Sequence, residues 1–298
     1  MIGYGISQAE LEAKIEAAVP GWLKRAHDRT DAFRTAGAYD EKSPIWSEVK
    51  PVYLKLQGEC KCAFCERKIG SLPLCKIEFD VEHFRPKGHV KPWKASKETA
   101  QELADMGMAV AALAGGGGAG YHLLPYHPFN YAAACKPCNS VLKGDYFPIA
   151  GAYSFADDNP AALLAEEPLL IYPIGNFDCD PEQLIQFTGV SPKAVAADDY
   201  GRARAKVTIE FFLLDDVNKR RDLLDERCLL IIALYPQLEK LAANPANAKV
   251  RRFVTNRLKP SARHANCARS FKRLFDADPA TAETIFQDAF AQLDSKSP

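Results

Sequence analysis

Two short cysteine motifs constrain this chain of 298 residues more strongly than any other feature of its sequence. Both have the spacing C-x2-C, and a long stretch of chain separates Cys62 and Cys65 from Cys135 and Cys138. One such turn lets two thiolates reach the same ion, and two turns complete the closed tetrahedral site of a structural zinc. We therefore expect these four cysteines to bind Zn²⁺ and to hold two distant segments together. Four ordinary buried cysteines are the alternative.

The other cysteines lack a partner at this spacing. Cys60 adds a third thiol beside the first motif, but a single intervening residue does not fit a metal-binding turn. The remaining four are Cys75, Cys179, Cys228 and Cys267. The first residues contain early acids and no apolar run, which predicts no signal peptide. We therefore expect thiols at these five positions rather than disulfides.

Three polar residue types with a known joint chemistry lie between and beside the cysteine motifs. Glu82 and His83 are adjacent, Asn130 precedes the second motif, and Asn139 follows it directly. A zinc staple would hold a carboxylate, an imidazole and an amide in one place. This combination is typical of metal-dependent nucleases.

The order of these elements resembles the HNH endonucleases that carry a zinc-stapled ββα-metal core. The strings E-H-F-R-P-K (82–87) and C-x2-C-N-x3-K-G-x2-F-P (135–148) are closer still to the HNH proteins of bacterial defence systems, the Septu and retron-associated kind. Three further strings are similar to the downstream region of that family: E-x-P-L-L-I-Y-P (166–173), D-C-D-P-E (178–182) and T-I-E-F-F-L-L-D (208–215). The resemblance covers roughly residues 45–230.

The resemblance implies a role for each matching residue. Glu82 and Asn139 would hold a catalytic Mg²⁺ or Mn²⁺, hard ions that prefer oxygen ligands. His83 would be the general base, since a neutral imidazole can take a proton from an attacking water. Asn130 would position the loop that bears this base.

Other nearby residues are candidates for supporting roles. Arg85, Lys87 and Lys143 would donate charge-assisted hydrogen bonds to phosphates that flank the cut. His127 lies close to Asn130 in sequence and is either an auxiliary ligand or base, or a structural loop histidine.

Composition predicts a soluble, cytoplasmic protein. The periodic patterns and the resemblance together predict the α+β class, mostly helical. The hydrophobic content is 47%, the net formal charge is zero, and no apolar segment reaches the length of a membrane span. We expect a helical platform (1–58), a zinc-stapled ββα-metal HNH core (59–150), and a mixed, then helical C-terminal region (151–298). The core contains an insertion (93–120), which is either a surface loop or a lid or partner-binding arm.

Local patterns predict several elements. Ser7 and Glu10 form a capping box, Pro20 ends the first helix, and a second covers 22–34. Ser43 would cap a third helix, which begins at Pro44 and extends to Gly58. Alternation over 76–84 predicts a strand, and 96–113 predicts a helix before the glycine-rich linker 114–120. The second cysteine motif should lie on a helix that ends at Gly144. Further helices are expected at 201–213, 216–242, 246–257, 261–275 and 280–293.

The last third of the chain contains a basic segment without acids. Its cations are Lys249, Arg251, Arg252, Arg257, Lys259, Arg263, Arg269, Lys272 and Arg273. Because backbone neutralisation supplies most non-specific affinity for nucleic acids, we favour phosphate contact. The alternative is a helix face that pairs with acidic groups of this chain or of a partner.

Two classes of function follow from these patterns. The first is a divalent-metal-dependent endonuclease that cuts DNA. The second is a zinc-stapled nucleic-acid-binding module without catalysis. Nothing in the sequence distinguishes DNA from RNA. Relatives of the resembled kind often act beside an ATPase, and this chain has no G-x4-G-K-[ST] loop of its own, so nucleotide control would require a partner protein.

Overall fold

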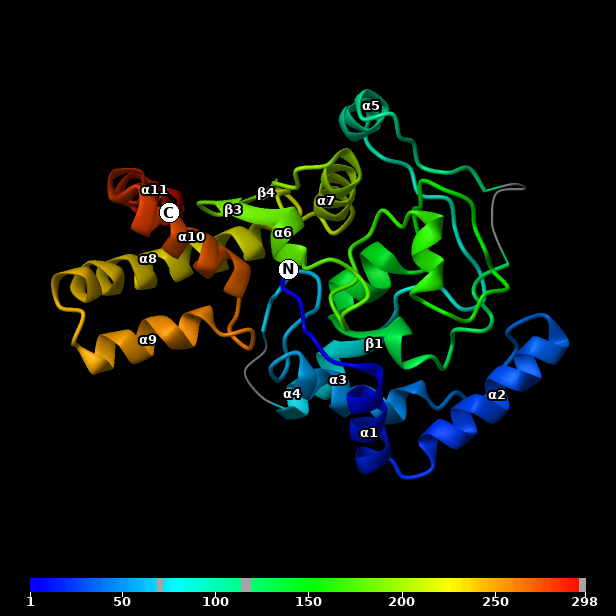
Figure 1. The fold of residues 1–298 in the computed structure, drawn as a ribbon. Helices are drawn as coiled ribbons and strands as arrows, with labels where there is room; N and C mark the ends of the chain where they lie inside the picture. The colour runs from blue at the N-terminus through cyan, green and yellow to red at the C-terminus, as the bar shows by residue number, and fades with distance from the viewer. Residues whose placement is uncertain (69–71, 114–118, 295–298) are drawn as a thin grey trace.

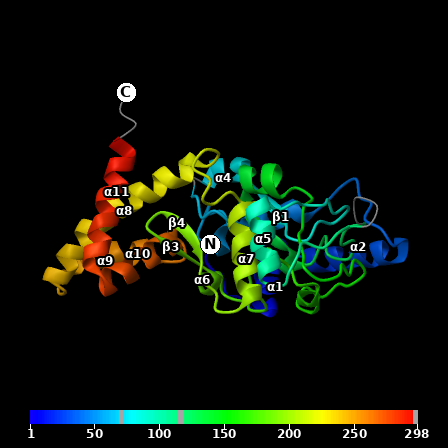
Figure 2. The ribbon, with the colours of Figure 1, turned by 90° about the horizontal axis from the view of Figure 1, so that it is seen from above.

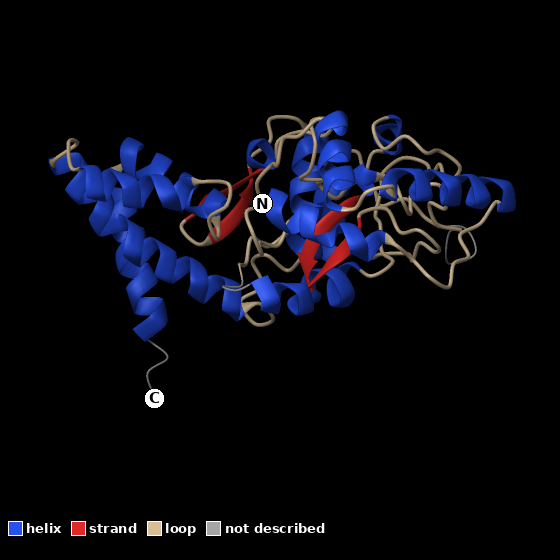
Figure 3. Cartoon of the chain, turned by 90° about the horizontal axis from the view of Figure 1, so that it is seen from below, coloured by secondary structure: helices blue, strands red, loops and turns tan. Residues whose placement is uncertain are grey.

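The computed structural model describes residues 1–68, 72–113 and 119–294. The fold is α+β and helices predominate, as the sequence predicts, while the strands of the described chain form two separate antiparallel pairs. Figure 1 shows the arrangement of the elements, and Figure 3 shows the two strand pairs lying apart among helices and long loops.

The first part of the chain is helical. Its elements are α1 (Gln8–Ala18), α2 (Trp22–Ala36), the 3-10 helix η1 (Trp46–Val49), α3 (Lys50–Leu56) and α4 (Leu72–Glu78). The predicted capping box is confirmed, because the Ser7 side chain accepts from Glu10 N and the Glu10 side chain accepts from Ser7 N. The prediction that Ser43 caps the third helix is wrong, because Ile45 is the N-cap residue. The backbone of Ile45 is held by tertiary partners, Trp22 Nε1 and the Tyr126 hydroxyl, and the helix begins one residue later.

The central part contains the first strand pair and the second cysteine motif. Its elements are β1 (Phe79–His83), α5 (Lys97–Asp105), the 3-10 helix η3 (Pro128–Asn130), β2 (Tyr131–Cys135) and the π-helix η4 (Pro137–Lys143). β1 and β2 pair antiparallel from Phe79↔Cys135 to His83↔Tyr131. The predicted strand over 76–84 is therefore too long. Residues 76–78 have no pairing partner beyond Cys135 and belong to α4.

The predicted insertion packs against the rest of the molecule. The helix expected over 96–113 ends at Asp105, since Gly107 has a φ of +72° that a helix does not allow. From there the chain turns back, and Ala111 N donates to Ile149 O at 2.8 Å. Residues 114–118 of the expected linker lie outside the described ranges.

The last part begins with short elements and ends in helices. The elements are η5 (Ala162–Glu166), α6 (Pro181–Leu184), β3 (Ile185–Thr188), β4 (Ser191–Ala194), α7 (Asp199–Phe211), α8 (Arg221–Ala243), α9 (Ala248–Leu258), α10 (Ala265–Ala277) and α11 (Pro279–Asp294). The five helices expected from residue 201 onward are confirmed, and α8 continues through Pro236. Figures 1 and 2 show α8 to α11 gathered at one end of the molecule and α2 at the other.

Two hydrophobic cores organise the chain. The larger runs from Met1 to Leu223, includes Ala265 of α10 and contains residues of all three predicted segments, so the boundaries at 58 and 150 do not separate cores. The smaller lies between α8, α9, α10 and α11 and includes Phe187 of β3. Asn266 of α10 connects them, because its buried amide donates to the backbone carbonyls of Met1 and Ile185. Within the described ranges, no helix combines the length and apolar character of a membrane span.

Candidate metal centre and polar site around His83

The four predicted cysteines come together in one buried group. Cys62 and Cys65 lie in the turn after α3, and Cys135 and Cys138 lie where β2 passes into η4. Their sulfur atoms all lie within 4.8 Å of one another, and Cys65 Sγ is 3.7 Å from Cys135 Sγ. Four sulfurs at about 2.3 Å from a tetrahedral zinc would be roughly 3.8 Å apart. The donor set and its spacing therefore fit an ion such as Zn²⁺, and the predicted grouping is confirmed.

Donors around this group suit a negatively charged centre. Four thiolates around Zn²⁺ would carry a net charge of −2, which needs compensation when buried. Cys135 N–H donates to Cys62 Sγ at 3.4 Å, and Arg220 Nη1 donates to Cys138 Sγ at 3.7 Å. Hydrogen bonds with the other cysteines, of which that with Cys135 has the largest effect, hold the pKa of the Cys65 thiol well below its usual value. Sequence reasoning missed Arg220, because no local pattern indicates which cation reaches the cysteines.

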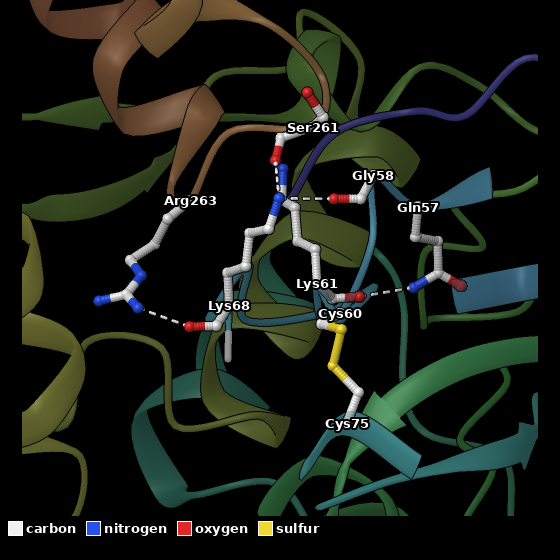
Figure 4. The surroundings of a disulfide bond; sticks show 8 residues. All are labelled: Gln57, Gly58, Cys60, Lys61, Lys68, Cys75, Ser261 and Arg263. Carbon is white, nitrogen blue, oxygen red and sulfur yellow. Dashed lines mark hydrogen bonds between the residues drawn. A yellow bond between two sulfur atoms is a disulfide. The ribbon is translucent and has the colours of Figure 1, made fainter. Parts of the chain in front are cut away.

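The prediction of free thiols is wrong at two positions. Cys60 and Cys75 are joined by a disulfide, and their Cα atoms are 5.4 Å apart, within the normal range for such a bond. Figure 4 shows that the bond links the turn of the first cysteine motif to α4. The sequence does not indicate this pair, because the turn after α3 and the course of α4 bring the two residues together. Cys179, Cys228 and Cys267 keep their thiols, as expected, and the Cys228 thiol donates to Gln292 Oε1 at 3.4 Å.

Glu82 forms a buried ion pair with Lys143. The carboxylate lies 3.3 Å from Lys143 Nζ, and the two side chains are 4% and 0% exposed. Burial raises the pKa of Glu82 to about 7, although the charge of Lys143 opposes the rise. The expected phosphate contact of Lys143 is not supported, because its ammonium is directed into the interior and not to a surface.

His83 lies on the opposite face of β1 from Glu82, as strand alternation requires. Its ring packs edge-on against Trp46 and Tyr131, with centroid distances of 4.9 and 5.1 Å. His83 Nε2 is 3.2 Å from Pro125 O, which can only accept, so Nε2 carries the proton and Nδ1 the lone pair. Burial holds the pKa of His83 well below its ordinary value. The side chain is therefore a neutral imidazole whose Nδ1 carries a lone pair that can accept a proton.

Asn130 fixes the backbone that follows His83. Its Oδ1 accepts from Arg85 N at 2.7 Å, and its Nδ2 donates to Arg85 O at 3.0 Å and to Leu124 O at 3.1 Å. Asn130 is 1% exposed, so water does not replace these contacts. The Asn130 side chain therefore fixes the backbone at Arg85, two residues after His83.

Asn139 lies half-buried on η4, four residues before Lys143. Its carbonyl accepts from Gly144 N at 2.7 Å, and Gly144 has a φ of +43° at the end of the helix, as predicted. Within the described chain, no hydrogen bond joins the Asn139 side chain to Glu82. The partner that the structure gives the Glu82 carboxylate is Lys143.

The donor types at this place fit a hard divalent ion. Glu82 offers a carboxylate and Asn139 an amide, and Mg²⁺ is commonly held by one or two carboxylates together with waters and substrate phosphates. In the described ranges, the four cysteines are the only group of three or more His, Cys, Asp or Glu side chains arranged to hold an ion. Glu82 would have to exchange Lys143 for the ion.

Arg85 and Lys87 have different surroundings. Arg85 is 2% exposed, pairs with Glu166 at 3.2 Å and donates to Leu163 O at 2.8 Å. It is an interior residue, and the expected phosphate contact is not supported. Lys87 is half-buried, with Nζ 4.5 Å from the centroid of the Trp46 ring. Burial lowers the pKa of Lys87. Burial remains the larger cause for both neighbours: the positive charge of Lys87 opposes the rise in the pKa of Glu82 and adds to the fall in the pKa of His83.

His127 has a structural contact. Its Nδ1 accepts from Phe129 N at 3.1 Å and so caps η3. Burial lowers its pKa to about 4.

The basic segment 249–273 divides into paired and unpaired cations. Four of the nine lie against acids: Arg263 with Glu226, Arg269 and Arg273 with Glu182, and Lys272 with Asp276. Among the described residues, the other five form no ion pair: Lys249, Arg251, Arg252, Arg257 and Lys259. The segment is therefore partly a helix face that pairs with acids of this chain.

This chain matches no protein-family model, no curated protein and no solved structure with which it was compared.

Proposed function

We propose that this chain is a divalent-metal-dependent endonuclease of the HNH type, with DNA as the expected substrate. One observation carries the proposal. The buried cysteine group ties the turn before β1 to the end of β2, and Asn130 clamps the backbone two residues after His83. A neutral imidazole is thereby held in a fixed frame, and the residues follow the chain order that the resemblance implies.

The proposed chemistry assigns each residue a task. His83, with its proton on Nε2, takes a proton through Nδ1 from the water that attacks phosphorus. Zn²⁺ held by the four cysteines has no open position and serves as a staple. Glu82 and Asn139 would hold Mg²⁺ or Mn²⁺, which when bound neutralises charge on the phosphate and the leaving oxygen. A role in bacterial defence and control by an ATPase partner belong to the proposal through the resemblance alone.

A second function is favoured by the contacts of the same residues. Glu82 is bound to Lys143, and His83 is 7% exposed between two aromatic rings. A chain that keeps these contacts on its substrate would bind nucleic acid through its zinc-stapled fold without cutting it.

Metal rescue distinguishes the two functions. We expect His83→Ala to abolish DNA cleavage and Glu82→Ala and Asn139→Ala to reduce it, while zinc content and DNA affinity stay near those of the wild type. Raised Mn²⁺ should partly restore the two ligand variants and not His83→Ala, because only the former weaken ion binding. His27→Ala is the matched control, since His27 is a largely exposed histidine on α2. Full activity of His83→Ala would refute the assignment. Inactivity of the wild type on every DNA and RNA, alone and with an ATPase partner, would favour the binding module.

A further inference from the structure

A cleft separate from the polar site lies between α8, α9 and the segment that joins α9 to α10. Its volume is about 750 Å³, and we name it the α8–α9 cleft. The residues that define it are Lys68, Phe253, Asn256, Arg257, Lys259 and Arg263. Lys68 comes from the turn of the first cysteine motif, so the cleft adjoins the stapled part of the molecule.

The α8–α9 cleft is strongly basic. Lys68, Arg257, Lys259 and Arg263 line it, and Glu226 is the acidic residue that faces them. The carboxylate of Glu226 is already engaged. It lies 2.9 Å from His264 Nε2, 3.5 Å from Arg67 and 3.4 Å from Arg263. A concave surface with one sign of charge focuses its field on an oppositely charged ligand.

Two of these cations are available for a ligand. Arg257 and Lys259 are exposed, and neither forms an ion pair within the described ranges. The Arg257 guanidinium lies 5.1 Å from the centroid of the Phe253 ring, which limits its motion. By contrast, Arg269, Lys272 and Arg273 pair with acids outside the cleft.

The cleft floor is rigidly built. Lys68 Nζ donates to Gly58 O at 2.7 Å and to Ser261 O at 3.2 Å, and Arg263 donates to Lys68 O (Figure 4). Gly58 has a φ of +82°, and a Cβ there would lie 2.3 Å from Ser261 Cα. Only glycine allows this close approach of the two segments. The cations of the floor are therefore held in place by backbone contacts.

We propose that the α8–α9 cleft binds the phosphate backbone of a single-stranded nucleic acid, which gives the proposed nuclease a second contact with its substrate. A cleft of this volume encloses a small ligand and is too small for a duplex. Basic grooves with aromatic and arginine stacking surfaces are the usual means of holding single strands. The inference rests on the proposed function for its substrate class.

Binding of a fluorescent 12-nucleotide strand, followed by anisotropy without divalent ions, tests this proposal. The cleft variant Arg257→Glu/Lys259→Glu should weaken affinity about tenfold or more and flatten its salt dependence, because each lost phosphate contact removes roughly 0.7 from the slope for a single strand. The matched control Arg251→Glu/Arg252→Glu makes the same charge change on α9 outside the cleft, and should weaken affinity less than about threefold. The neutral variant Arg257→Gln/Lys259→Gln checks that the loss of affinity does not come from misfolding. Its circular dichroism should be unchanged while its affinity falls.

The outcomes separate this inference from the proposed function. DNA and RNA strands should both respond to the cleft variant, and a duplex should respond less. Four results would each overturn the proposal that the cleft binds single strands. They are an equal or larger effect of the control variant, unchanged affinity of the cleft variant, an equal effect on a duplex, and no binding by the wild type. The same proteins are assayed for cleavage with Mn²⁺. If the cleft variant keeps its affinity and the proteins cleave DNA, only the proposed cleft binding is contradicted. If the cleft variant loses affinity and the wild type does not cleave, the cleft binding is supported and the proposed nuclease activity is contradicted.

Discussion

Replacing Asn130 by alanine should destabilise this protein more than its size suggests. The side chain is 1% exposed and makes three hydrogen bonds to the backbone of Arg85 and Leu124. Leu124 O also accepts from His127 N at 3.2 Å and keeps that partner in the variant. The N–H and C=O of Arg85 lose their contacts with the Asn130 side chain.

The structure sets the size of the effect. A buried polar group left without a partner costs about 1–3 kcal/mol, so two such groups cost roughly 2–6 kcal/mol. Asn139 provides the matched control, because the same substitution there removes a half-buried amide for which the described chain provides no side-chain hydrogen bond. We expect Asn139→Ala to change the free energy of unfolding by less than about 0.5 kcal/mol.

Urea unfolding followed by circular dichroism measures both free energies. Asn130→Ala should also lose cleavage, because the backbone two residues after His83 is no longer fixed, whereas Asn139→Ala should lose cleavage at wild-type stability. A loss below about 0.5 kcal/mol for Asn130→Ala would refute the positioning role.

Three further predictions concern stability. Cys135→Ser should lower zinc from about one ion per chain and destabilise the fold, as measured by elemental analysis and unfolding; full zinc at unchanged stability would contradict the staple. Cys75→Ser should cost about 3 kcal/mol in non-reducing urea unfolding, because the Cys60 disulfide closes a 15-residue loop, and an unchanged value would count against the bond. Burial raises the pKa of Asp178, but Arg204 outweighs this and leaves it below its ordinary value. The stability that this carboxylate contributes is present above its unfolded pKa of about 3.9 and is lost as pH falls through the lower folded pKa. The difference in free energy of unfolding between the wild type and Asp178→Asn should therefore shrink below about pH 4. A difference that does not change with pH contradicts the ion pair of Asp178 with Arg204.

Local patterns predicted the elements whose cause is local. The capping box of Ser7, the C-terminal helices and the grouping of the four cysteines depend on short-range periodicity or spacing, and all are found. The strand predicted over 76–84 is too long, because the length of a paired strand depends on a partner that is distant in the sequence. β2 ends at Cys135, so residues 76–78 join a helix despite their alternation.

Long-range contacts decided the rest. Arg85 and Lys143 were predicted to contact phosphates, yet each is paired with a buried acid, Arg85 with Glu166 and Lys143 with Glu82. The sequence cannot show such pairings, since the partners come from segments that only the fold brings together. The Cys60–Cys75 disulfide and the contact of Arg220 with Cys138 have the same origin.

Nicking of supercoiled plasmid by the purified, zinc-loaded protein tests the central claim most directly. With Mg²⁺ or Mn²⁺, the wild type should convert supercoiled DNA to nicked or linear forms, and His83→Ala purified identically should not. The reason is that neutral His83 supplies the base through Nδ1, while its substitution leaves the cysteine group intact. Equal cleavage by both proteins, or cleavage that persists without any divalent ion, would contradict the account.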